Sequence, residues 1–185
     1  MHSRDSLKKY LEDLSARKPV PGGGSAASLV AAFGVSLMSM VVRYTLGKPS
    51  CAKYNKKLRV ILVKTEAWRS RLLCLSDADS KAFASGDKDK MVKVPLEVFS
   101  ISSEALKLCR QLVLISSKGI SSDAAVAAAL LESACFSSVC NVRINLLGKK
   151  GRRFRSLLSG LKKKLVTAQA AREETEVRIG EIIGW

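Results

Sequence analysis

Apolar residues recur along most of the chain at the three- and four-residue spacing of one helix face. In the first predicted helix, 5–16, this stripe consists of Leu7, Tyr10, Leu11 and Leu14. The same spacing predicts five further helices at about 25–46, 52–83, 94–115, 123–147 and 153–180. The fourth helix would carry Pro95 in its first turn, where proline is tolerated, after a polar break at 85–90. Because no long strand-like alternation occurs, the pattern predicts an all-α protein with about six helices.

Two of these helices are almost free of charge. No charged residue occurs between Pro19 and Val42, and the fifth helix stays nearly uncharged as far as Arg143. We therefore expect both at the centre of an antiparallel or orthogonal bundle, wrapped by the charged helices. The apolar part of the first, AASLVAAFGVSLMSMVV, is just short of a membrane span and contains serines and a glycine, which favours a soluble bundle. A membrane-embedded hairpin of the two helices is the alternative.

Composition narrows the class of protein further. The 185 residues, 47% hydrophobic and 5% aromatic, predict one domain over 1–185 with closely packed helices. Five scattered cysteines without a CxxC motif predict reduced thiols in a cytoplasmic protein, and residues 1–17 lack the pattern of a signal peptide. The only histidine is His2, so we expect neither a histidine-based metal site nor a Cys–His nucleophile.

The formal net charge of +16 leaves three roles open. It is typical of nucleic-acid binding, of attraction for an anionic small substrate such as a polyglutamylated cofactor, or of solubility alone. Eight Lys and Arg and no acid lie in the segment 149–164, which is either a solvated helix face or a binding surface. The lack of interleaved aromatic residues and of a nucleic-acid motif argues against nucleic acid as the partner.

A PGGGS segment, Pro21, Gly22, Gly23, Gly24 and Ser25, precedes the second helix. Glycine lets a ligand approach the backbone without a Cβ in the way. The first N–H groups of a helix lack intrahelical acceptors, and the helix dipole is positive there. The segment therefore predicts a site for a carboxylate, a phosphate or a polarised carbonyl, with a flexible linker as the alternative. It fits neither a Walker loop nor GxGxxG.

Two acids stand near the end of the third helix, in the segment SDADSKAF at 76–83. Asp77 and Asp79 are two residues apart, so they point about 200° away from each other and cannot face one substrate. Asp79 shares a face with Ala82 and Phe83, which makes it the inward candidate and leaves Asp77 to the solvent. A carboxyl beside apolar neighbours has a raised pKa and can move protons near neutral pH. The alternative is a helix-end acid without a role.

The fifth predicted helix carries polar residues at both ends. Asp123 is its natural cap or first-turn acid, and Asn141 lies on the same face eighteen residues later, about 27 Å away. The two cannot contact one small reacting centre within one subunit. Asn145 follows one turn after Asn141. The two asparagines are expected either to join helices by hydrogen bonds or to recognise the edge of a heterocycle.

The ordered segments PGGGSAAS, DADSKAF, VPLEV, SDAAVAAALLE and NVRINL together resemble one known family. It is the cyclodeaminase/cyclohydrolase family, which comprises the C-terminal domain of formiminotransferase-cyclodeaminase and free-standing methenyltetrahydrofolate cyclohydrolases. The resemblance covers most of the chain. It implies an all-helical homodimer that binds a tetrahydrofolate derivative in a cleft near the subunit interface, without metal. In a dimer, the two ends of the fifth helix would serve different sites.

Residue by residue, the resemblance implies that Asp79 is the catalytic acid–base residue. It assigns substrate binding to Pro21, Gly22, Gly23, Gly24, Ser25, Ser122, Asp123, Asn141 and Asn145. The implied reaction is hydrolysis of 5,10-methenyltetrahydrofolate or, alternatively, release of ammonia from formiminotetrahydrofolate. The basic residues would attract a polyglutamate tail on the folate.

The sequence departs from the family between Phe83 and Val94. Only ASGDKDKMVK joins them, whereas family members carry a longer segment there, often with a Leu-Pro-Lys stretch. A shorter connection opens the pocket or removes substrate contacts. A function of another class therefore stays open, namely a basic helical module without catalysis that binds nucleic acid or another polyanion.

Overall fold

The computed structural model describes residues 6–184, and within that range the fold consists of helices without a β-strand. The elements are α1 (Leu7–Ser15), α2 (Gly23–Thr45), η2 (Pro49–Tyr54), α3 (Asn55–Ser85), α4 (Lys88–Ile115), η3 (Lys118–Ile120), α5 (Ser121–Asn145) and α6 (Arg152–Ile183). The all-α prediction is confirmed. His2 and Asp5, the latter at the predicted start of the first helix, lie outside the described residues.

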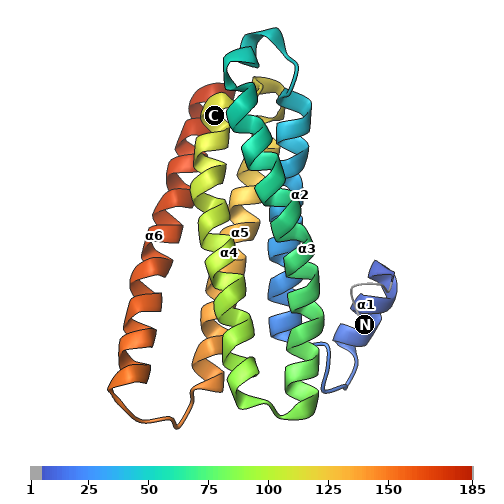
Figure 1. The fold of residues 1–185 in the computed structure, drawn as a ribbon, viewed down its shortest axis with the longest axis vertical. Helices are drawn as coiled ribbons and strands as arrows, with labels where there is room; N and C mark the ends of the chain where they lie inside the picture. The colour runs from blue at the N-terminus through green and yellow to red at the C-terminus, as the bar shows by residue number, and fades with distance from the viewer. Residues whose placement is uncertain (1–5, 185) are drawn as a thin grey trace.

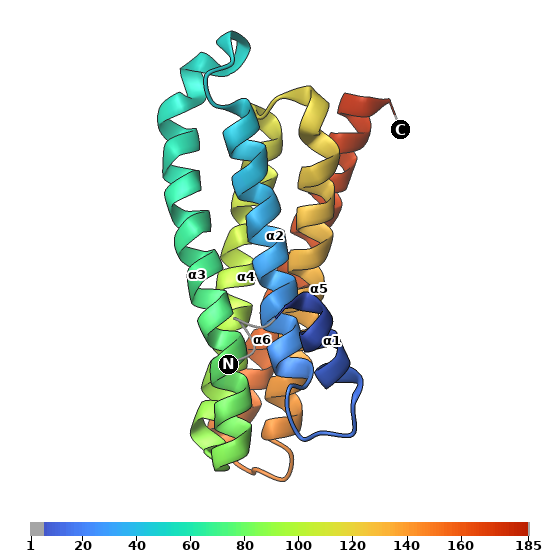
Figure 2. The ribbon, with the colours of Figure 1, turned by 90° about the vertical axis from the view of Figure 1, so that its right-hand side faces the viewer.

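Five long helices run up and down the molecule, and the short α1 lies beside the beginning of α2 (Figures 1 and 2). α2 packs against α3 and α5, and α6 packs against α4 and α5. α4 contacts α2, α3, α5 and α6, so it fills the middle of one side of the bundle. This arrangement brings the start of α2, the end of α3 and the end of α5 to the same end of the molecule (Figure 2).

The connection between α3 and α4 is a tight turn rather than the predicted polar break. Gly86 takes φ 65°, a left-handed conformation that glycine adopts without strain, and ends α3. The Asp87 side chain then caps α4 by accepting a hydrogen bond of 3.0 Å from the Lys90 N–H. α4 therefore begins at Lys88 and not near Val94, because the polar residues 88–90 form its first turn.

Pro95 consequently lies inside α4, and the prediction that it stands in the first turn is wrong. A proline has no N–H to donate to the carbonyl four residues earlier, which here belongs to Met91. The Asn145 side chain at the end of α5 donates its amide N–H to that carbonyl at 2.6 Å. The internal proline is therefore accommodated by a hydrogen bond from a neighbouring helix.

Small residues let α2 and α5 approach closely. A Cβ added to Gly34 would lie 2.8 Å from the Leu131 Cγ and 3.2 Å from the Ala127 carbonyl oxygen, so only glycine fits at this crossing. Ala31, Ala127 and Ala128 are fully or almost fully buried around it. The packing agrees with the predicted contact between the two helices of lowest charge.

One apolar face of α2 and α5 nevertheless stays uncovered in the single chain. We call it the α2–α5 outer face, made of Phe33, Leu37, Met40 and Tyr44 on α2 and Val126, Ala129, Phe136 and Cys140 on α5. Phe33, Tyr44 and Phe136 are 51%, 62% and 57% exposed. Gly23–Thr45 and Lys118–Asn145 are long and apolar enough to cross a membrane, while 61% and 44% of their most apolar windows are buried within the bundle.

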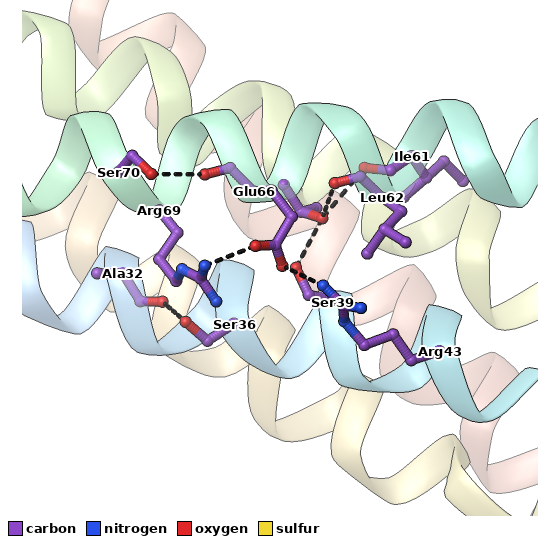
Figure 3. A network of polar contacts seen from close by, with 10 residues as sticks. Ala32, Ser36, Ser39, Arg43, Ile61, Leu62, Glu66, Arg69 and Ser70 are labelled. Atoms are coloured by element: carbon purple, nitrogen blue, oxygen red, sulfur yellow. Dashed lines mark hydrogen bonds and ion pairs between the residues drawn. The ribbon is translucent and has the colours of Figure 1, made fainter.

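A polar network joins the outer sides of α2 and α3 (Figure 3). Glu66 on α3 accepts a hydrogen bond from Arg69 at 2.6 Å and pairs with Arg43 of α2 at 3.3 Å. Beside it, the Ser39 hydroxyl donates to Thr65 at 2.8 Å. Burial alone would raise the pKa of Glu66, but the neighbouring Ser39 hydroxyl, Arg43 and Arg69 lower it below its usual value. The pair of helices is thus held by charge as well as by packing.

α1 docks differently from the prediction. Of its apolar stripe, Tyr10 is buried, but Leu7 and Leu11 are 57% and 52% exposed. Asp13, also buried, accepts hydrogen bonds from Lys9 at 2.7 Å and from Lys18 in the following loop. α1 is therefore held by one aromatic ring and one ion-paired carboxylate rather than by an apolar face.

Candidate active site at the start of the second helix

α2 begins inside the triple glycine. Gly22 is its N-cap and provides no side chain to accept a hydrogen bond from the first turn. The helix starts at Gly23, not at Ser25 as predicted, so Ser25 is the third helical residue. The Ala26 N–H donates to the Gly22 carbonyl at 3.0 Å, but the N–H groups of Gly23, Gly24 and Ser25 have no acceptor within α2. Acceptors from outside α2 are required here.

Asp79 on α3 provides such an acceptor. Its carboxylate lies directly over Gly24, where a Cβ would come within 2.1 Å of Oδ1. The Ser25 backbone N–H donates a hydrogen bond to it. Asp79 therefore does what an N-cap side chain usually does, although it belongs to another helix. The predicted approach of the triple glycine and the Asp79 carboxyl is present within a single chain.

The electrostatics of Asp79 combine two opposing effects. Burial raises the pKa of the Asp79 carboxyl above its usual value, because it disfavours the charged form. The hydrogen bond from the Ser25 N–H acts in the opposite direction, and burial prevails. A half-buried carboxyl with a raised pKa suits a group that accepts and returns a proton.

The prediction that Asp77 is solvated is wrong. Asp77 is only 7% exposed, and the neighbouring Ser76 is fully buried. The spacing of residues within α3 predicts which side of the helix faces the bundle. It does not predict whether other parts of the chain cover the opposite side, where Asp77 was expected to be exposed. Asp77 is therefore the more buried of the two acids, whereas the half-buried Asp79 is the one that lies against the glycines.

Ser25 is the centre of a buried chain of hydroxyl groups. Its Oγ lies 2.7 Å from the Ser76 Oγ and 3.1 Å from the Tyr10 hydroxyl oxygen. Its side chain is fully buried and bonds the hydroxyl groups of Tyr10 and Ser76, while its backbone N–H faces Asp79. Tyr10 and Ser76 were not among the predicted site residues. A tyrosine in an apolar stripe and a serine one residue before the acid motif were the available signals.

The two asparagines of α5 separate into different roles. The Asn141 Oδ1 lies beside Gly23, 3.5 Å from where its Cβ would be, and the Asn141 amide donates to the Ser137 carbonyl at 2.9 Å. Asn141 therefore completes the rim of the site. Asn145 instead bonds the Met91 carbonyl. Of the two interpretations left open, joining of helices is the one that fits Asn145.

Ser122 and Asp123 lie at the far end of α5. That helix begins at Ser121 with Ile120 as its N-cap, so Asp123 is not the cap but a first-turn acid. α5 is continuous from Ser121 to Asn145, which keeps Asp123 about 27 Å from Asn141. Pro21 is buried. Within one chain, the site thus contains residues 21–25, Asp79 and Asn141, and excludes Ser122 and Asp123.

Residues 6–184 contain no group of three or more Cys, Asp or Glu side chains arranged to hold a metal ion. The predicted absence of a metal stays a prediction. A surface hollow of about 640 Å³ between α4 and α6, lined by residues including Arg110, Leu114 and Glu174, lies away from Asp79. The polar groups gathered at the start of α2 are the Asp79 carboxyl, the backbone N–H groups of the first turn and the Asn141 amide.

The chain also resembles known proteins. The sequence model of the formiminotransferase-cyclodeaminase family matches residues 6–86 and 87–160. The two matched segments meet between Gly86 and Asp87, at the tight turn within the stretch where the sequence predicts a shortened connection.

Two relatives differ in how much of their length they share with this chain. Formimidoyltransferase-cyclodeaminase of Rattus norvegicus is 30% identical over 164 residues, covering 76% of this chain and 30% of the rat protein. Methenyltetrahydrofolate cyclohydrolase of Methylorubrum extorquens is 27% identical over 177 residues, covering 83% of this chain and 85% of that protein. The chain thus spans about a third of the rat protein and most of the bacterial one.

A solved structure extends the likeness to the whole fold. The crystal structure of formiminotetrahydrofolate cyclodeaminase from Thermotoga maritima matches with a TM-score of 0.84 and 25% identity, covering 100% of this chain and 98% of that one. The resemblance expected from the ordered motifs is confirmed. With the family model matching more than half of its residues, the chain belongs to the formiminotransferase-cyclodeaminase family.

Proposed function

We propose that this protein is an enzyme of folate one-carbon metabolism that hydrolyses 5,10-methenyltetrahydrofolate, with Asp79 as general acid and base. The observation that carries the proposal is the Asp79 carboxylate held over Gly24 at the start of α2, whose N-cap residue Gly22 has no side chain. The proposal is supported by the relative named methenyltetrahydrofolate cyclohydrolase, most of whose length the chain covers.

The reaction requires one group that moves protons. Water adds to the amidinium carbon of the substrate while Asp79 accepts one of its protons. The bond from that carbon to one nitrogen then breaks, Asp79 returns the proton to the leaving nitrogen, and the remaining hydroxyl proton passes to the solvent as the formyl carbonyl forms. The N–H groups of Gly23 and Gly24 hold an electron-rich oxygen of the folate, and the Asn141 amide contacts the edge of its ring. No step needs a metal or a covalent intermediate.

The same site suits a second reaction of the same class. In the cyclodeaminase reaction, a folate nitrogen attacks the formimino carbon and ammonia leaves, again with a single proton carrier. This alternative is favoured by the Thermotoga maritima neighbour, named formiminotetrahydrofolate cyclodeaminase, which the chain covers almost completely. Asp79 and Asn141 have the same roles in both reactions, so the two are separated by assay.

The basic residues suit a polyglutamylated folate. Lys149, Lys150, Arg152, Arg153 and Arg155 follow Asn145 at the end of the bundle that holds the site. All are exposed, and none forms an ion pair with a carboxylate within the described part of the chain. A row of unpaired cations near the site attracts a chain of glutamates, and the attraction weakens as salt increases.

A homodimer completes the proposal. The α2–α5 outer face is the kind of exposed apolar surface that a second copy covers. If two copies pack antiparallel about the middle of this face, the Asp123 end of one α5 comes to the Asn141 end of the other. Ser122 and Asp123 would then serve the site of the second copy. A cytoplasmic location and independence from membranes belong to the same proposal.

The alternative of another class is a basic module that binds nucleic acid or another polyanion without catalysis. The eight unpaired cations of 149–164 favour it. Binding of RNA or DNA that persists at physiological salt, in a protein without affinity for folates, would support this function instead.

Side-by-side assays decide between these functions. Purified protein is given 5,10-methenyltetrahydrofolate and formiminotetrahydrofolate separately, and loss of methenyl absorbance and release of ammonia are followed. Asp79→Asn is the test variant and Asp77→Asn the matched control. Turnover of either folate that Asp79→Asn abolishes supports the enzyme, and the faster substrate names the reaction. Rates equal to the uncatalysed background with both folates reject the enzyme.

A further inference from the structure

α1 contributes little to the packing of the bundle. Its buried side chains are Tyr10 and Asp13, while Leu7 and Leu11 face outward. The Asp13 carboxylate is occupied by Lys9 and Lys18. Tyr10 is thus the apolar residue by which α1 packs against the rest of the protein, and it is only 4% exposed.

The Tyr10 hydroxyl contacts Ser25, the residue whose backbone N–H bonds Asp79. It lies 3.1 Å from the Ser25 Oγ, which is also 2.7 Å from the Ser76 Oγ. Two hydroxyl partners on two different helices fix the rotamer of Ser25 and restrain its backbone. The N–H of that same residue donates to the Asp79 carboxylate. A contact path therefore runs from α1 through Ser25 to Asp79.

We propose that Tyr10 is a positioning residue that, through Ser25, fixes the orientation of the Asp79 carboxylate over Gly24. The kinetic consequence rests on the proposed function, whereas the structural coupling does not. Without the hydroxyl, the first turn of α2 has more freedom, and the Ser25 N–H points less consistently at the carboxylate. On this proposal, α1 restrains the first turn of α2 through Tyr10 and contributes little to the apolar core.

No change of charge accompanies this coupling. Around Asp79, α2 carries no ionisable side chain in its first turns, and Asn141 of α5 is neutral. α3 adds Asp77, and α1 with its loop adds Tyr10 and the Asp13 cluster with Lys9 and Lys18. Removal of the Tyr10 hydroxyl leaves all these charges in place. Tyr10 and Asp79 also interact electrostatically, so the Ser25→Ala background is needed to separate the route through Ser25 from this direct effect.

The test uses Tyr10→Phe, which keeps the ring, with Tyr54→Phe in η2 at the opposite end of the bundle as the matched control. The first readout is the titration of the Asp79 carboxyl by carbon-13 NMR in the free protein. Because the Ser25 N–H favours the charged carboxylate, its loosening in Tyr10→Phe moves the titration midpoint to higher pH. In Tyr54→Phe the midpoint stays where it is in the wild type.

The second readout is kinetic, with the folate that the wild type turns over. Tyr10→Phe is expected to lower kcat roughly 10- to 100-fold, as small misplacements of a reacting group do, with KM within about twofold of the wild type. Ser25→Ala removes the link, so Tyr10→Phe should add nothing further in that background. The two substitutions are therefore expected to be non-additive.

An unchanged Asp79 titration in Tyr10→Phe overturns the proposal, and so do kinetic effects of Tyr10→Phe and Ser25→Ala that simply multiply. A wild type that turns over neither folate rejects the proposed function alone. The NMR titration still decides the coupling in that case, because it needs no substrate.

Discussion

Asn145 donates its side-chain amide to the Met91 carbonyl oxygen at 2.6 Å, and this is the carbonyl that Pro95 cannot serve. A proline inside a helix usually leaves one carbonyl without its partner. Here the last turn of α5 supplies the missing donor to α4. In the sequence, Asn145 could have been a residue that recognises a heterocycle. The structure instead explains it as the donor to an unserved backbone carbonyl of the neighbouring helix.

The role of Asn145 predicts a coupling between two positions. Asn145→Ala should lower the free energy of unfolding by about 1–2 kcal/mol, because a carbonyl loses its donor. With Pro95→Ala in the same chain, the restored N–H at position 95 serves Met91, and the loss should be clearly smaller. Urea denaturation of the wild type, both single variants and the double variant measures the difference. Equal losses in both backgrounds would show that Asn145 has another role.

The close contact between Gly24 and Asp79 predicts that one added methyl group at position 24 displaces the Asp79 carboxylate. Gly24→Ala places a Cβ where the Asp79 carboxylate now lies. Since the end of a side chain can move aside, the fold should persist, but the carboxylate is displaced and turnover should fall at least about tenfold. Gly119→Ala in η3, outside the site, is the control, because no atom lies within 4 Å of the position of its Cβ. Comparable losses of kcat in both variants would show that the effect of Gly24→Ala does not come from displacement of the Asp79 carboxylate.

Asp79 predicts opposite effects on activity and stability. Its folded pKa is raised, so it weakens the fold as pH rises from its unfolded pKa, near 4, through the folded value. Asp79→Asn should therefore become more stable relative to the wild type between pH 4 and pH 7, as measured by Tm. Its activity should fall about 10²- to 10⁴-fold. A stability difference independent of pH would contradict a buried, titrating carboxyl at this position.

Asp13 predicts that α1 loosens in acid. Hydrogen bonds from Lys18 and then Lys9 lower the pKa of Asp13 from 3.8 to about 2. A lowered pKa stabilises the folded form above pH 4, and this contribution disappears as the pH falls from about 4 to about 2. Hydrogen exchange of the α1 amides should accelerate over that window. In Asp13→Asn exchange should be fast at every pH, whereas Glu12→Gln on the exposed side should leave the window unchanged.

The α2–α5 outer face predicts a dimer that charge disrupts. Phe33→Asp and Phe136→Asp each place a carboxylate in the middle of an apolar surface. Light scattering should give twice the mass of the 20.0 kDa chain for the wild type and a smaller mass for the variants. Val63→Asp, at an even more exposed apolar position on α3, is the control. A wild type that is monomeric at micromolar concentration rejects the dimer, and one that requires detergent favours the membrane hairpin.

Periodicity and ordered motifs predicted the six helices and the family, because these depend on local spacing and residue type. They also placed Asp79 against the triple glycine. They failed where burial depends on residues outside the element itself. Asp77 was expected in solvent from its position on the helix, but it is only 7% exposed. Pro95 also fits inside a helix because a distant asparagine replaces its missing N–H. Tyr10 belonged to the apolar stripe in the sequence, and only the fold shows its hydroxyl beside Ser25.

The acid–base group of the proposed reaction is also the acceptor that holds the first turn of α2. Each time Asp79 takes up a proton, its hold on the Ser25 N–H weakens. The backbone amide of Ser25 is thus a reporter placed by the fold itself. Its NMR resonance should register both the charge on the carboxyl and the arrival of a substrate, without any label.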